Sequence, residues 1–499
     1  MTISGTQFTG ASAVDFAGLT APAYTVNSPT SITATVPSGS GTVDVTVTTP
    51  SGTSTANGGD QFGYTGGPPA PTLVATYRGD LGRSGYYPSE TGLTTGNAPS
   101  LKLHWTDTSG SGGFAQPIVA DNMVFWSDWT GALHGTALTG TDNWATNIGT
   151  DTPPSSQNCN PASAGPTGAP TVATVGSTTE LYVPGGNDVL YALNAQTGAQ
   201  IWSTSLGSPP NNFLWDSPIL YEGSIYEGVA SYGDCPLVQG KLAQVNATTG
   251  AIEHIFDTVP NNCTGGGIWG SPTVDPTDGT IYVTTGTPGC GGPGSLAPSL
   301  VKLNASNLSL ISSWTVPSSA QAAGDADFGA TPVLFTGTVG GKVTQLVGAV
   351  DKNAIFYAFD RANLAAGPVW QSTLATASSN PSVGSIISAA WDGSTLYVGG
   401  GTATINGTNC NGNIDALNPS TGAFLWRTCQ SSPMLGGITV VPGVIVEGTL
   451  GGSVLFLNAA NGSTLYTYQA ASLIEGECTV SNGIVYVPVA NGSLVALGQ

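Results

Sequence analysis

Two copies of one phrase decide the fold: ALNAQTGAQIW at residues 192–202 and ALNPSTGAFLW at residues 416–426. Looser copies occur at 135–144, 244–254, 302–314, 358–370 and 456–466. Each phrase follows residues that alternate as in strands, for example STLYVGGG at 394–401. Self-similarity at a period of some tens of residues is typical of propellers and solenoids, in which each repeat is one small unit.

The two ends of the repeat region supply the halves of one more copy. The chain ends in GSLVALGQ (492–499), which is the first half of the phrase, and SLKLHW (100–105) is the missing second half. Joining them closes a ring and removes the exposed strand edges of an open sheet array. We therefore expect an all-β fold over 73–499: an eight-bladed β-propeller closed by pairing of its N- and C-terminal strands.

The phrase itself predicts a tight turn followed by a large side chain that packs between two blades. Asn before Thr-Gly favours a tight turn, because glycine adopts positive φ without strain. The terminal tryptophan is large enough to fill the space between two blades. We interpret these tryptophans as structural residues and not as ligand sites.

A smaller module precedes the repeats. TVDVTVTTP at 42–50 alternates with period two, as half-buried strands do. Residues 1–66 resemble an IPT/TIG domain, a small immunoglobulin-like β-sandwich, in the order of their Gly, Phe and Val positions. This resemblance implies a spacer or attachment module without catalysis. GGPPAPT then predicts a stiff Pro-rich linker over 67–72.

Composition narrows the function classes. The formal net charge is −20 with nine Lys plus Arg, which argues against a nucleic-acid partner because binding phosphates needs a basic surface. No apolar run is long enough to predict a membrane span. The three histidines fall at docking positions or outer strands, so a His-based metal or Ser-His-Asp site is not expected.

Seven cysteines without a CxxC spacing point to disulfides and not to a metal site. Together with few lysines and many Thr, Ser and Asn residues, they predict a secreted or cell-surface protein. Cys263 with Cys290, and Cys410 with Cys429, are close enough in sequence to bridge neighbouring loops. The odd count leaves at least one free thiol, or one partner outside the chain, and buried free thiols are the alternative for most of them.

The phrase A-x-D/N-x-x-T-G-x-x-x-W resembles the tryptophan-docking motif of quinoprotein alcohol dehydrogenases, the propellers that carry pyrroloquinoline quinone (PQQ). The resemblance spans about 73 to the end. It includes the lead-in YRGDLGRSGYYPSE (77–90), GGGIWGSPTVDP (265–276), GDADFGATPVLF (324–335) and AVDKNAIFYAFD (349–360). Within this family, the sequence resembles the polyvinyl-alcohol dehydrogenases.

The resemblance implies three cofactor positions. Trp269 stands where the family places an indole under the flat quinone, and such a floor orders a planar ring at low entropic cost. Asp325 matches the catalytic aspartate, which takes the alcohol proton as hydride leaves for the quinone. Lys352 matches the basic residue at the quinone oxygens.

The calcium site of the family departs most from the pattern. A hard cation needs oxygen ligands with sufficient negative charge. Here Ser231 stands at the Glu position and Thr287 at the Asn position, which leaves Asp325 as the one acidic ligand. The adjacent-cysteine disulfide of many members is also missing from the sequence. We therefore expect that PQQ can bind and that the calcium site is weakened.

Structural roles remain open for every one of these residues. Trp269 could fill the channel centre, Asp325 and Asp327 could be solvated loop acids, and Lys352 could pair with a nearby aspartate. Glu475 and Glu477 could add charge to one mouth of the channel, and we assign them no role. Two functions follow as hypotheses: a secreted dehydrogenase that oxidises an alcohol or polyol, or a non-catalytic surface propeller that binds a glycan, polymer or protein.

Overall fold

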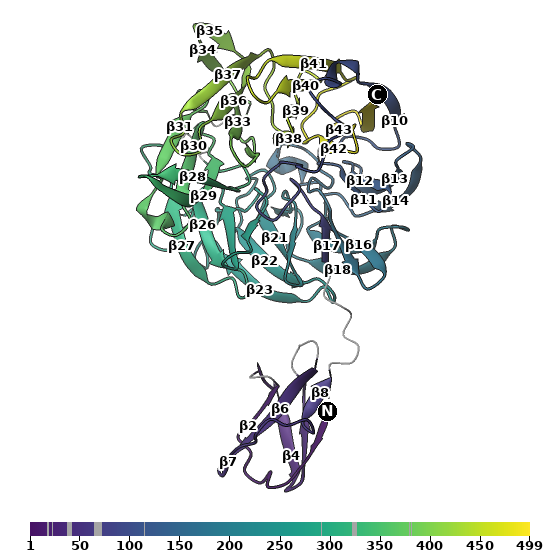
Figure 1. Ribbon diagram of the computed structural model, residues 1–499, viewed down its shortest axis with the longest axis vertical. Coiled ribbons are helices and arrows are strands. Elements are labelled where there is room, and N and C mark those ends of the chain that lie inside the picture. Colours follow the sequence, from purple (N-terminus) through teal and green to yellow (C-terminus); the bar gives the residue numbers. More distant parts are fainter. Residues whose placement is uncertain are drawn as a thin grey trace. The chain divides into compact units, whose positions relative to one another are not determined.

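The computed structural model divides the chain into two compact units, Met1–Pro69 and Ala70–Gln499. It describes residues 1–16, 19–21, 23–36, 42–63, 72–113, 115–290, 292–321, 327–378, 380 and 382–499. Almost all regular structure in these residues is strand (Figure 1). None of the helices in this part of the chain is long and apolar enough to cross a membrane.

The first unit consists of two antiparallel sheets around one core. One sheet has the order β1 (Thr2–Ser4), β5 (Ser31–Ala34), β4 (Tyr24–Ser28); the other has β3 (Leu19–Thr20), β2 (Ala13–Phe16), β6 (Thr42–Thr49), β7 (Gly52–Thr53), with β8 (Gln61–Gly63) on β6. Alternate residues point inward as the period-two pattern predicts, and Phe16, Ile32 and Val45 meet in the shared core. The assignment of this unit to the IPT/TIG family stays a prediction.

In the second unit, the described strands form eight antiparallel sheets arranged in a ring, and their colours run in order around it (Figure 1). The first four sheets in chain order are β11 (Ile118–Ala120), β12 (Met123–Ser127), β13 (Ala132–Ala137), β14 (Asp142–Asn147); β15 (Thr171–Val175), β16 (Thr178–Pro184), β17 (Val189–Asn194), β18 (Gln200–Ser205), joined by β9 (Thr72–Ala75); β19 (Asn212–Phe213), β20 (Ile219–Tyr221), β21 (Ser224–Ser231), β22 (Lys241–Asn246), β23 (Ile252–Asp257); and β24 (Thr273–Asp275), β25 (Thr280–Thr284), β26 (Ser299–Asn304), β27 (Leu310–Thr315).

The other four sheets continue the ring. They are β28 (Val333–Val339), β29 (Lys342–Val350), β30 (Ile355–Asp360), β31 (Trp370–Thr373); β32 (Ala390–Trp391), β33 (Leu396–Gly400), β36 (Gly412–Leu417), β37 (Phe424–Gln430); β38 (Thr439–Val441), β39 (Val444–Gly448), β40 (Ser453–Asn458), β41 (Thr464–Gln469); and β42 (Thr479–Ser481), β43 (Ile484–Val489), β44 (Ser493–Gly498), β10 (Lys102–Asp107). The predicted all-β fold is confirmed.

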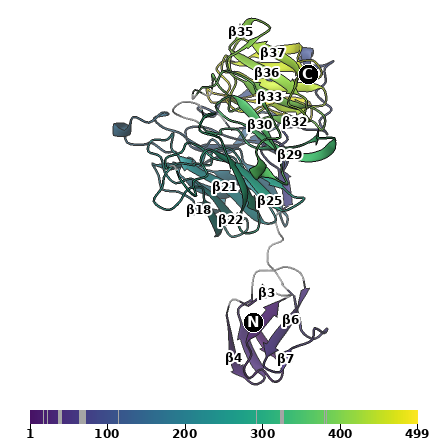
Figure 2. The ribbon, with the colours of Figure 1, turned by 90° about the vertical axis from the view of Figure 1, so that its left-hand side faces the viewer.

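Smaller elements lie in the connections. A hairpin of β34 (Ala403–Ile405) and β35 (Thr408–Cys410) projects from the rim beside β37 in both ribbon views (Figures 1 and 2). Three 3-10 turns are η1 (Ala98–Ser100), η2 (Ser155–Gln157) and η3 (Leu364–Ala366).

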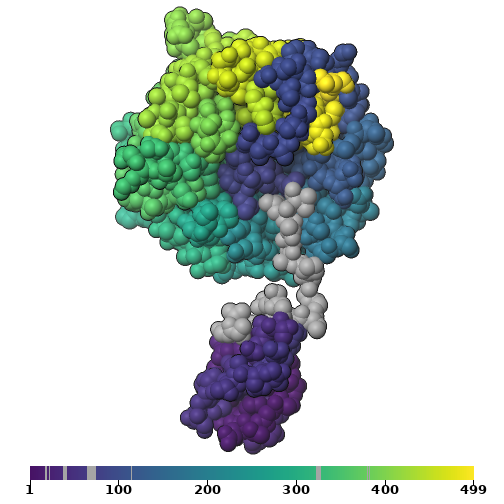
Figure 3. All heavy atoms as spheres, viewed as in Figure 1, coloured from purple at the N-terminus to yellow at the C-terminus, as the bar shows by residue number. Residues whose placement is uncertain are grey.

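The eighth sheet joins the two ends of the ring. β10 pairs antiparallel with β44, from Lys102 opposite Gly498 to Asp107 opposite Leu494. Figure 3 shows navy residues of the early ring directly against yellow residues of its end. This pairing unites the two half-phrases SLKLHW and GSLVALGQ in one sheet.

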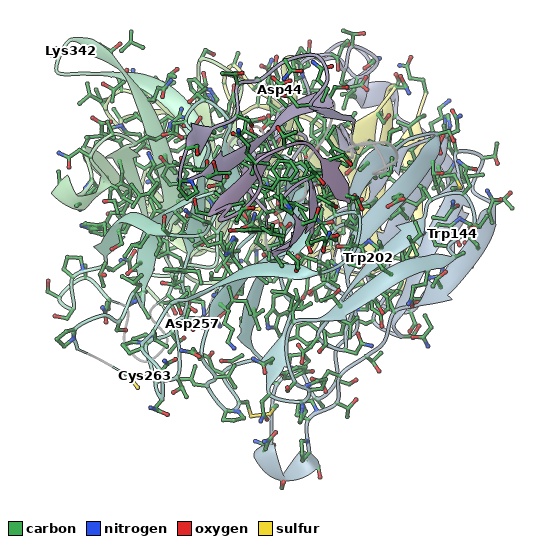
Figure 4. All side chains as sticks on the ribbon, turned by 90° about the horizontal axis from the view of Figure 1, so that it is seen from below. Asp44, Trp144, Trp202, Asp257, Cys263 and Lys342 are labelled. Atoms are coloured by element: carbon green, nitrogen blue, oxygen red, sulfur yellow. A yellow bond between two sulfur atoms is a disulfide. The ribbon has the colours of Figure 1, made fainter. Side chains whose placement is uncertain are left out.

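The phrase tryptophans connect neighbouring sheets. In five sheets the indole N–H donates to the carbonyl one residue beyond the Asn position of the next phrase, with N–O distances of 2.9 to 3.2 Å: Trp105 to Leu138, Trp144 to Ala195, Trp202 to Ala247, Trp370 to Pro419 and Trp426 to Ala459. Trp144 and Trp202 are labelled in Figure 4 on adjacent outer strands.

The phrase glycine is required for this contact. Gly198 has φ +68° and Gly250 has φ +71°, and a Cβ on either would stand within 2.7 Å of the tryptophan from the preceding sheet. Glycine therefore permits both the turn and the close approach of the indole.

Nearer the axis, hydroxyl groups tie consecutive sheets together. The backbone N–H of Ser217 donates to Ser271 Oγ at 2.9 Å, that of Ser271 to Thr331 Oγ1 at 3.1 Å, and that of Thr331 to Ser388 Oγ at 3.1 Å. The residues at the centre of the ring are thus held in fixed positions relative to one another.

Two arginines of the lead-in segment fill one end of the axial channel. Arg78 and Arg83 are fully buried. Arg78 forms an ion pair with Glu477 at 2.6 Å and donates to the carbonyls of Ala389 and Ile438. In Figure 3 the purple residues of this segment cover the ring centre on the face shown.

Arg83 forms hydrogen bonds on the opposite side of the ring. Its guanidinium donates to the carbonyls of Pro272, Ser217 and Pro218. Burial lowers its pKa to about 10. The two arginines together contact the third, fourth, sixth, seventh and eighth sheets, so the segment acts as a hub.

The disulfide prediction is correct for one pair and wrong for the other. Cys410 and Cys429 are bridged, whereas Cys263 and Cys290 are free thiols and Cys159 is bridged to Cys235 instead. Short sequence separation favours the wrong pair, but pairing depends on the distance between loops of different sheets. Cys159 and Cys235 are 76 residues apart with Cα atoms 5.6 Å apart. Figure 4 labels Cys263 on a loop.

Candidate functional site

The axial channel holds a cavity of about 210 Å³. Corresponding residues that precede the inner strands of the eight sheets line it: Ala115, Thr167, Trp215, Trp269, Gly329, Ile386, Leu435 and Glu475. Tyr77 and Gln116 also line it, next to the arginine hub. The cavity therefore offers two half-buried indoles, small residues and hydroxyl groups within one enclosure.

Trp269 is the centre of a connected group at this cavity. Its indole N–H donates to Asp327 Oδ2 at 3.1 Å, and the hydroxyl of Thr287 donates to the same oxygen at 3.4 Å. The ammonium of Lys352 lies 2.7 Å from Asp327 Oδ1 and 4.9 Å from the centroid of the Trp269 ring. Three of the residues selected from the sequence therefore meet around Asp327.

Segments of two neighbouring sheets bring this group together. Trp269 precedes β24 and Thr287 follows β25, both in the fourth sheet. Asp327 precedes β28 and Lys352 lies between β29 and β30, both in the fifth sheet. The backbone N–H of Lys352 also donates to the carbonyl of Asp327 at 2.9 Å. The loops of adjacent sheets are thus joined at side-chain and backbone level.

Glycines keep the indole edge open. A Cβ on Gly329 would lie 2.2 Å from Cη2 of Trp269, and one on Gly286 would lie 3.3 Å from its Cδ1. No other residue type fits at position 329 without moving the indole.

Two further predicted site residues are Asp325 and Ser231. Asp325 lies outside the described residues. Ser231 ends β21, where its hydroxyl accepts from the N–H of Val238 at 2.9 Å and its carbonyl accepts from the indole of Trp215 at 3.0 Å. The hydroxyl at the expected Glu position is therefore committed to the protein itself. Within the described ranges, no three His, Cys, Asp or Glu side chains form a group that could hold a metal ion.

Most acids of the channel are buried. Burial raises the pKa of Asp216 to about 6, and burial together with the charge of Asp216 raises the pKa of Glu227 well above its ordinary value. Burial likewise raises the pKa of Glu477, although Arg78 opposes it. Burial raises the pKa of Glu475, which lines the cavity. Glu477, one of the two acids that could add charge to a channel mouth, forms an ion pair with Arg78 at 2.6 Å.

Two features of the site escaped the sequence reasoning. WDSP at 215–218 repeats WGSP at 269–272, which is the signal that Trp215 shares the cavity with Trp269. Trp215 packs against Phe213 with a centroid distance of 4.3 Å and against Tyr232 at 5.8 Å. The second feature is the pair of buried arginines in YRGDLGR, a segment whose role no spacing reveals.

Asp327→Asn is expected to destabilise this site, because it removes the ion pair with Lys352 while keeping the hydrogen-bonding shape. The Lys352 and Asp327 side chains are 8% and 5% exposed, and breaking such a buried pair costs about 3 kcal/mol. The check is urea unfolding beside Asp278→Asn. Asp278 is 45% exposed in its pair with Lys302, so this control should lose less than about 1 kcal/mol. Equal losses would contradict a compact buried group.

Comparison with known proteins agrees with the architecture. The chain is 24% identical over 481 residues to a polyvinylalcohol dehydrogenase of Sphingopyxis sp. (strain 113P3), covering 81% of this chain and 70% of that enzyme. It is 25% identical over 219 residues to a polyvinylalcohol dehydrogenase of Pseudomonas sp., covering 39% of this chain and 33% of the enzyme. The chain thus spans a third of the length of one curated relative and under three quarters of the other.

A solved structure shows the same fold. The quinohemoprotein alcohol dehydrogenase ADHIIG of Pseudomonas putida HK5 superimposes with a TM-score of 0.69 at 16% identity, covering 85% of this chain and 80% of that one. The prediction of a quinoprotein dehydrogenase-like propeller is confirmed. A family model described as outer membrane protein assembly factor BamB matches residues 130–286, 261–434 and 410–499. The chain belongs to this family of repeat propellers.

Proposed function

We propose that this protein is a PQQ-dependent dehydrogenase that oxidises an alcohol, a polyol or a polyhydroxylated polymer. The observation that carries the proposal is the contact of Lys352 and Asp327 with Trp269, whose indole lines the axial cavity. The relatives named polyvinylalcohol dehydrogenase support the substrate class.

The residues fit a planar anionic cofactor. Trp269 offers a half-buried aromatic face, and Gly329 places no side chain against its Cη2 edge. Lys352 supplies an ammonium group beside that face, 4.9 Å from the ring centroid. Trp269 and Lys352 would therefore hold PQQ. When bound, PQQ supplies the acceptor for the hydride of the alcohol carbon.

The chain's own residues then orient the groups that would hold the cofactor, and they exclude water. Asp327 fixes the indole through its N–H and the ammonium through an ion pair, so it is a positioning residue. A proton must leave the alcohol hydroxyl as hydride departs, and a carboxylate within hydrogen-bond reach performs this step. We propose Asp325 as that base, on the resemblance alone. The arginine hub closes the far end of the channel and keeps bulk water from entering there.

The calcium ion of the resembled family does not fit the observed donors. Ser231 and Thr287 bring neutral hydroxyls, and these already bond to Val238 and Asp327. A hard cation needs charged oxygen ligands, so we assign no step to calcium.

We also infer that the protein works outside the cytoplasm, with residues 1–66 as an IPT/TIG spacer. Two disulfides support the location, since such bonds persist in oxidising compartments. The separate core of the first unit supports a module that folds by itself.

The alternative function is a non-catalytic propeller scaffold that binds a glycan, polymer or protein. Two observations favour it: the neutral residues at the calcium positions, and the three carboxyl groups of Asp216, Glu475 and Glu477 along a cavity whose lining has no Lys or Arg. A fold supports many functions, so the site must decide between the two.

Titration with PQQ tests the proposal. We expect saturable binding and a raised melting temperature, with the affinity reduced at least tenfold by Trp269→Ala because the stacking face is lost. Trp129→Ala, a half-buried tryptophan outside the cavity lining, is the matched control. Turnover of secondary alcohols with an artificial electron acceptor should follow binding. If neither the unmodified protein nor the control binds PQQ at tens of micromolar, the scaffold function takes its place.

A further inference from the structure

The docking position of the third sheet carries a histidine in place of tryptophan or tyrosine. In the third sheet the phrase QVNATTGAIEH ends in His254, where five other sheets place a tryptophan that bonds to the next sheet. The opposing turn in the fourth sheet also differs, because Leu308 stands where Gly198, Gly250, Gly422 and Gly462 stand in other phrases. Leu308 is 3% exposed and has φ +55°. The change is therefore matched on both sides of the contact.

Another residue has taken over the bond of the missing indole. The hydroxyl of Tyr226 donates to the carbonyl of Ala305 at 2.7 Å, the carbonyl that corresponds to those receiving tryptophan N–H groups elsewhere. The third and fourth sheets thus remain joined, and the His254 side chain is left exposed at their junction.

A pocket of about 260 Å³ stands at this junction. Its lining is polar and comes from β21, β22, β23 and the turns beside them: Glu222, Ser224, Gln244, Glu253, His254 and Ser306, together with Tyr226. The pocket therefore lies where the docking contact departs from the repeat.

Apart from the exposed His254 ring, the side-chain hydrogen-bond donors of this pocket bond within the protein. Ser224 donates to Glu253 Oε2 at 2.6 Å, and Asn246 donates to Glu253 Oε1 at 3.0 Å. Gln244 Nε2 lies 3.2 Å from Ser224 Oγ. Gln244 is 4% exposed, and its Oε1 has no hydrogen-bond partner in the described part of the chain. A buried amide oxygen in this state is costly unless a ligand donates to it.

Besides the His254 ring, the pocket therefore presents acceptors and negative charge outward. Glu222 and Glu253 are exposed carboxylates, and no Lys or Arg belongs to the lining. The complementary ligand carries several N–H donors and a positive charge, as a guanidinium group does with five donors in one plane. We propose that this pocket is a binding site for an organic cation of the guanidinium class. The site is separate from the axial cavity and does not depend on the proposed oxidation.

Binding at this site can be followed by the NMR signal of the His254 ring. The chain has three, so the His254 ring signal is readily resolved by NMR. Titration with methylguanidinium should shift that signal saturably, with a Kd on the order of 1 mM for so small a ligand. N-methylurea, which has a similar shape without charge, should cause no shift. A shift with both probes, or with neither, would overturn the proposal.

Variants separate the site from general surface charge. Glu253→Gln should weaken binding at least fivefold while it still accepts from Ser224. His254→Trp combined with Leu308→Gly restores the docking pair of the other sheets and should abolish binding, followed by ligand-observed NMR. Tyr466→Trp changes the docking residue of the seventh sheet and is the matched control, with unchanged binding. Undiminished binding in the double variant would overturn the proposal.

A final binding experiment distinguishes an arginine side chain from a free small cation as the source of the ligand. The tripeptide Gly-Arg-Gly with blocked ends should bind more tightly than methylguanidinium if the natural ligand is an arginine side chain of a protein. Equal or weaker binding of the peptide, with methylguanidinium retained, assigns the site to a free small cation. Either result supports the guanidinium site, and binding of the peptide with no effect of Glu253→Gln would contradict it.

Discussion

Arg78→Met is expected to lower the free energy of unfolding by about 4 kcal/mol, because it leaves Glu477 charged and unpaired in the channel. Both side chains are at most 1% exposed, and their N–O distance is 2.6 Å. The substitution also removes donors from the carbonyls of Ala389 and Ile438, which lie in two other sheets. Chemical denaturation monitored by tryptophan fluorescence measures the change.

A double variant isolates the ion pair from the packing. Arg78→Met with Glu477→Leu removes both charges and keeps most of the volume, so at least half of the lost stability should return. Lys342→Met, at the exposed first residue of β29, is the control and should change stability by less than about 0.5 kcal/mol. If the double variant is as unstable as Arg78→Met, the carbonyl contacts and not the ion pair stabilise the hub.

Stability is expected to fall as pH rises from 5 to 8. Burial raises the pKa of Asp188 to about 7, that of Asp216 to about 6, and that of Asp415 to about 7 although Arg427 opposes it. Each group is protonated in the folded protein at pH 5 but ionised in the unfolded chain, so the folded state binds more protons. Their stabilising contribution is complete below about pH 4 and is lost as pH passes through 6 to 7. The combined loss should be at least about 3 kcal/mol.

Asp188 is the best single test of this dependence. It is fully buried, and its two carboxylate oxygens have no hydrogen-bond partners among the described residues. Asp188→Asn should reduce the decline by about 2 kcal/mol and raise stability at pH 8, while leaving pH 5 nearly unchanged. Asp121→Asn, at an exposed turn, should leave the whole profile unaltered. A flat profile in the unmodified protein, or a rise in stability between pH 5 and pH 8, would refute the expected direction.

The fold was accessible from the sequence because its repeat is local. The turn glycines and terminal tryptophans of the phrase determine the contact between one sheet and the next, and two split halves reveal the closure. Disulfides were less accessible, since Cys159 and Cys235 meet through insertions of different sheets, 76 residues apart. Nothing in a local pattern encodes that distance.

The candidate site was only partly accessible for the same reason. Trp269 and Lys352 stood out through a resemblance of short motifs, and their contact through Asp327 depends on the angle between two sheets. Asp327 was one of two loop acids with no local feature to separate them. Trp215 was readable from WDSP, a repeat of WGSP outside the main phrase. The roles of Arg78 and Arg83 required the whole ring, since their acceptors come from five sheets.

The pairing of β10 with β44 has a consequence for biosynthesis. The first, third, fourth, fifth and seventh sheets can each be completed from consecutive strands as the chain leaves the ribosome. The eighth cannot, because Lys102 must wait for Gly498. During that interval the growing protein is an open arc with a bare strand edge at each end, the state in which β-proteins associate with one another. The interval between the synthesis of β10 and that of β44 therefore sets how long this open arc persists.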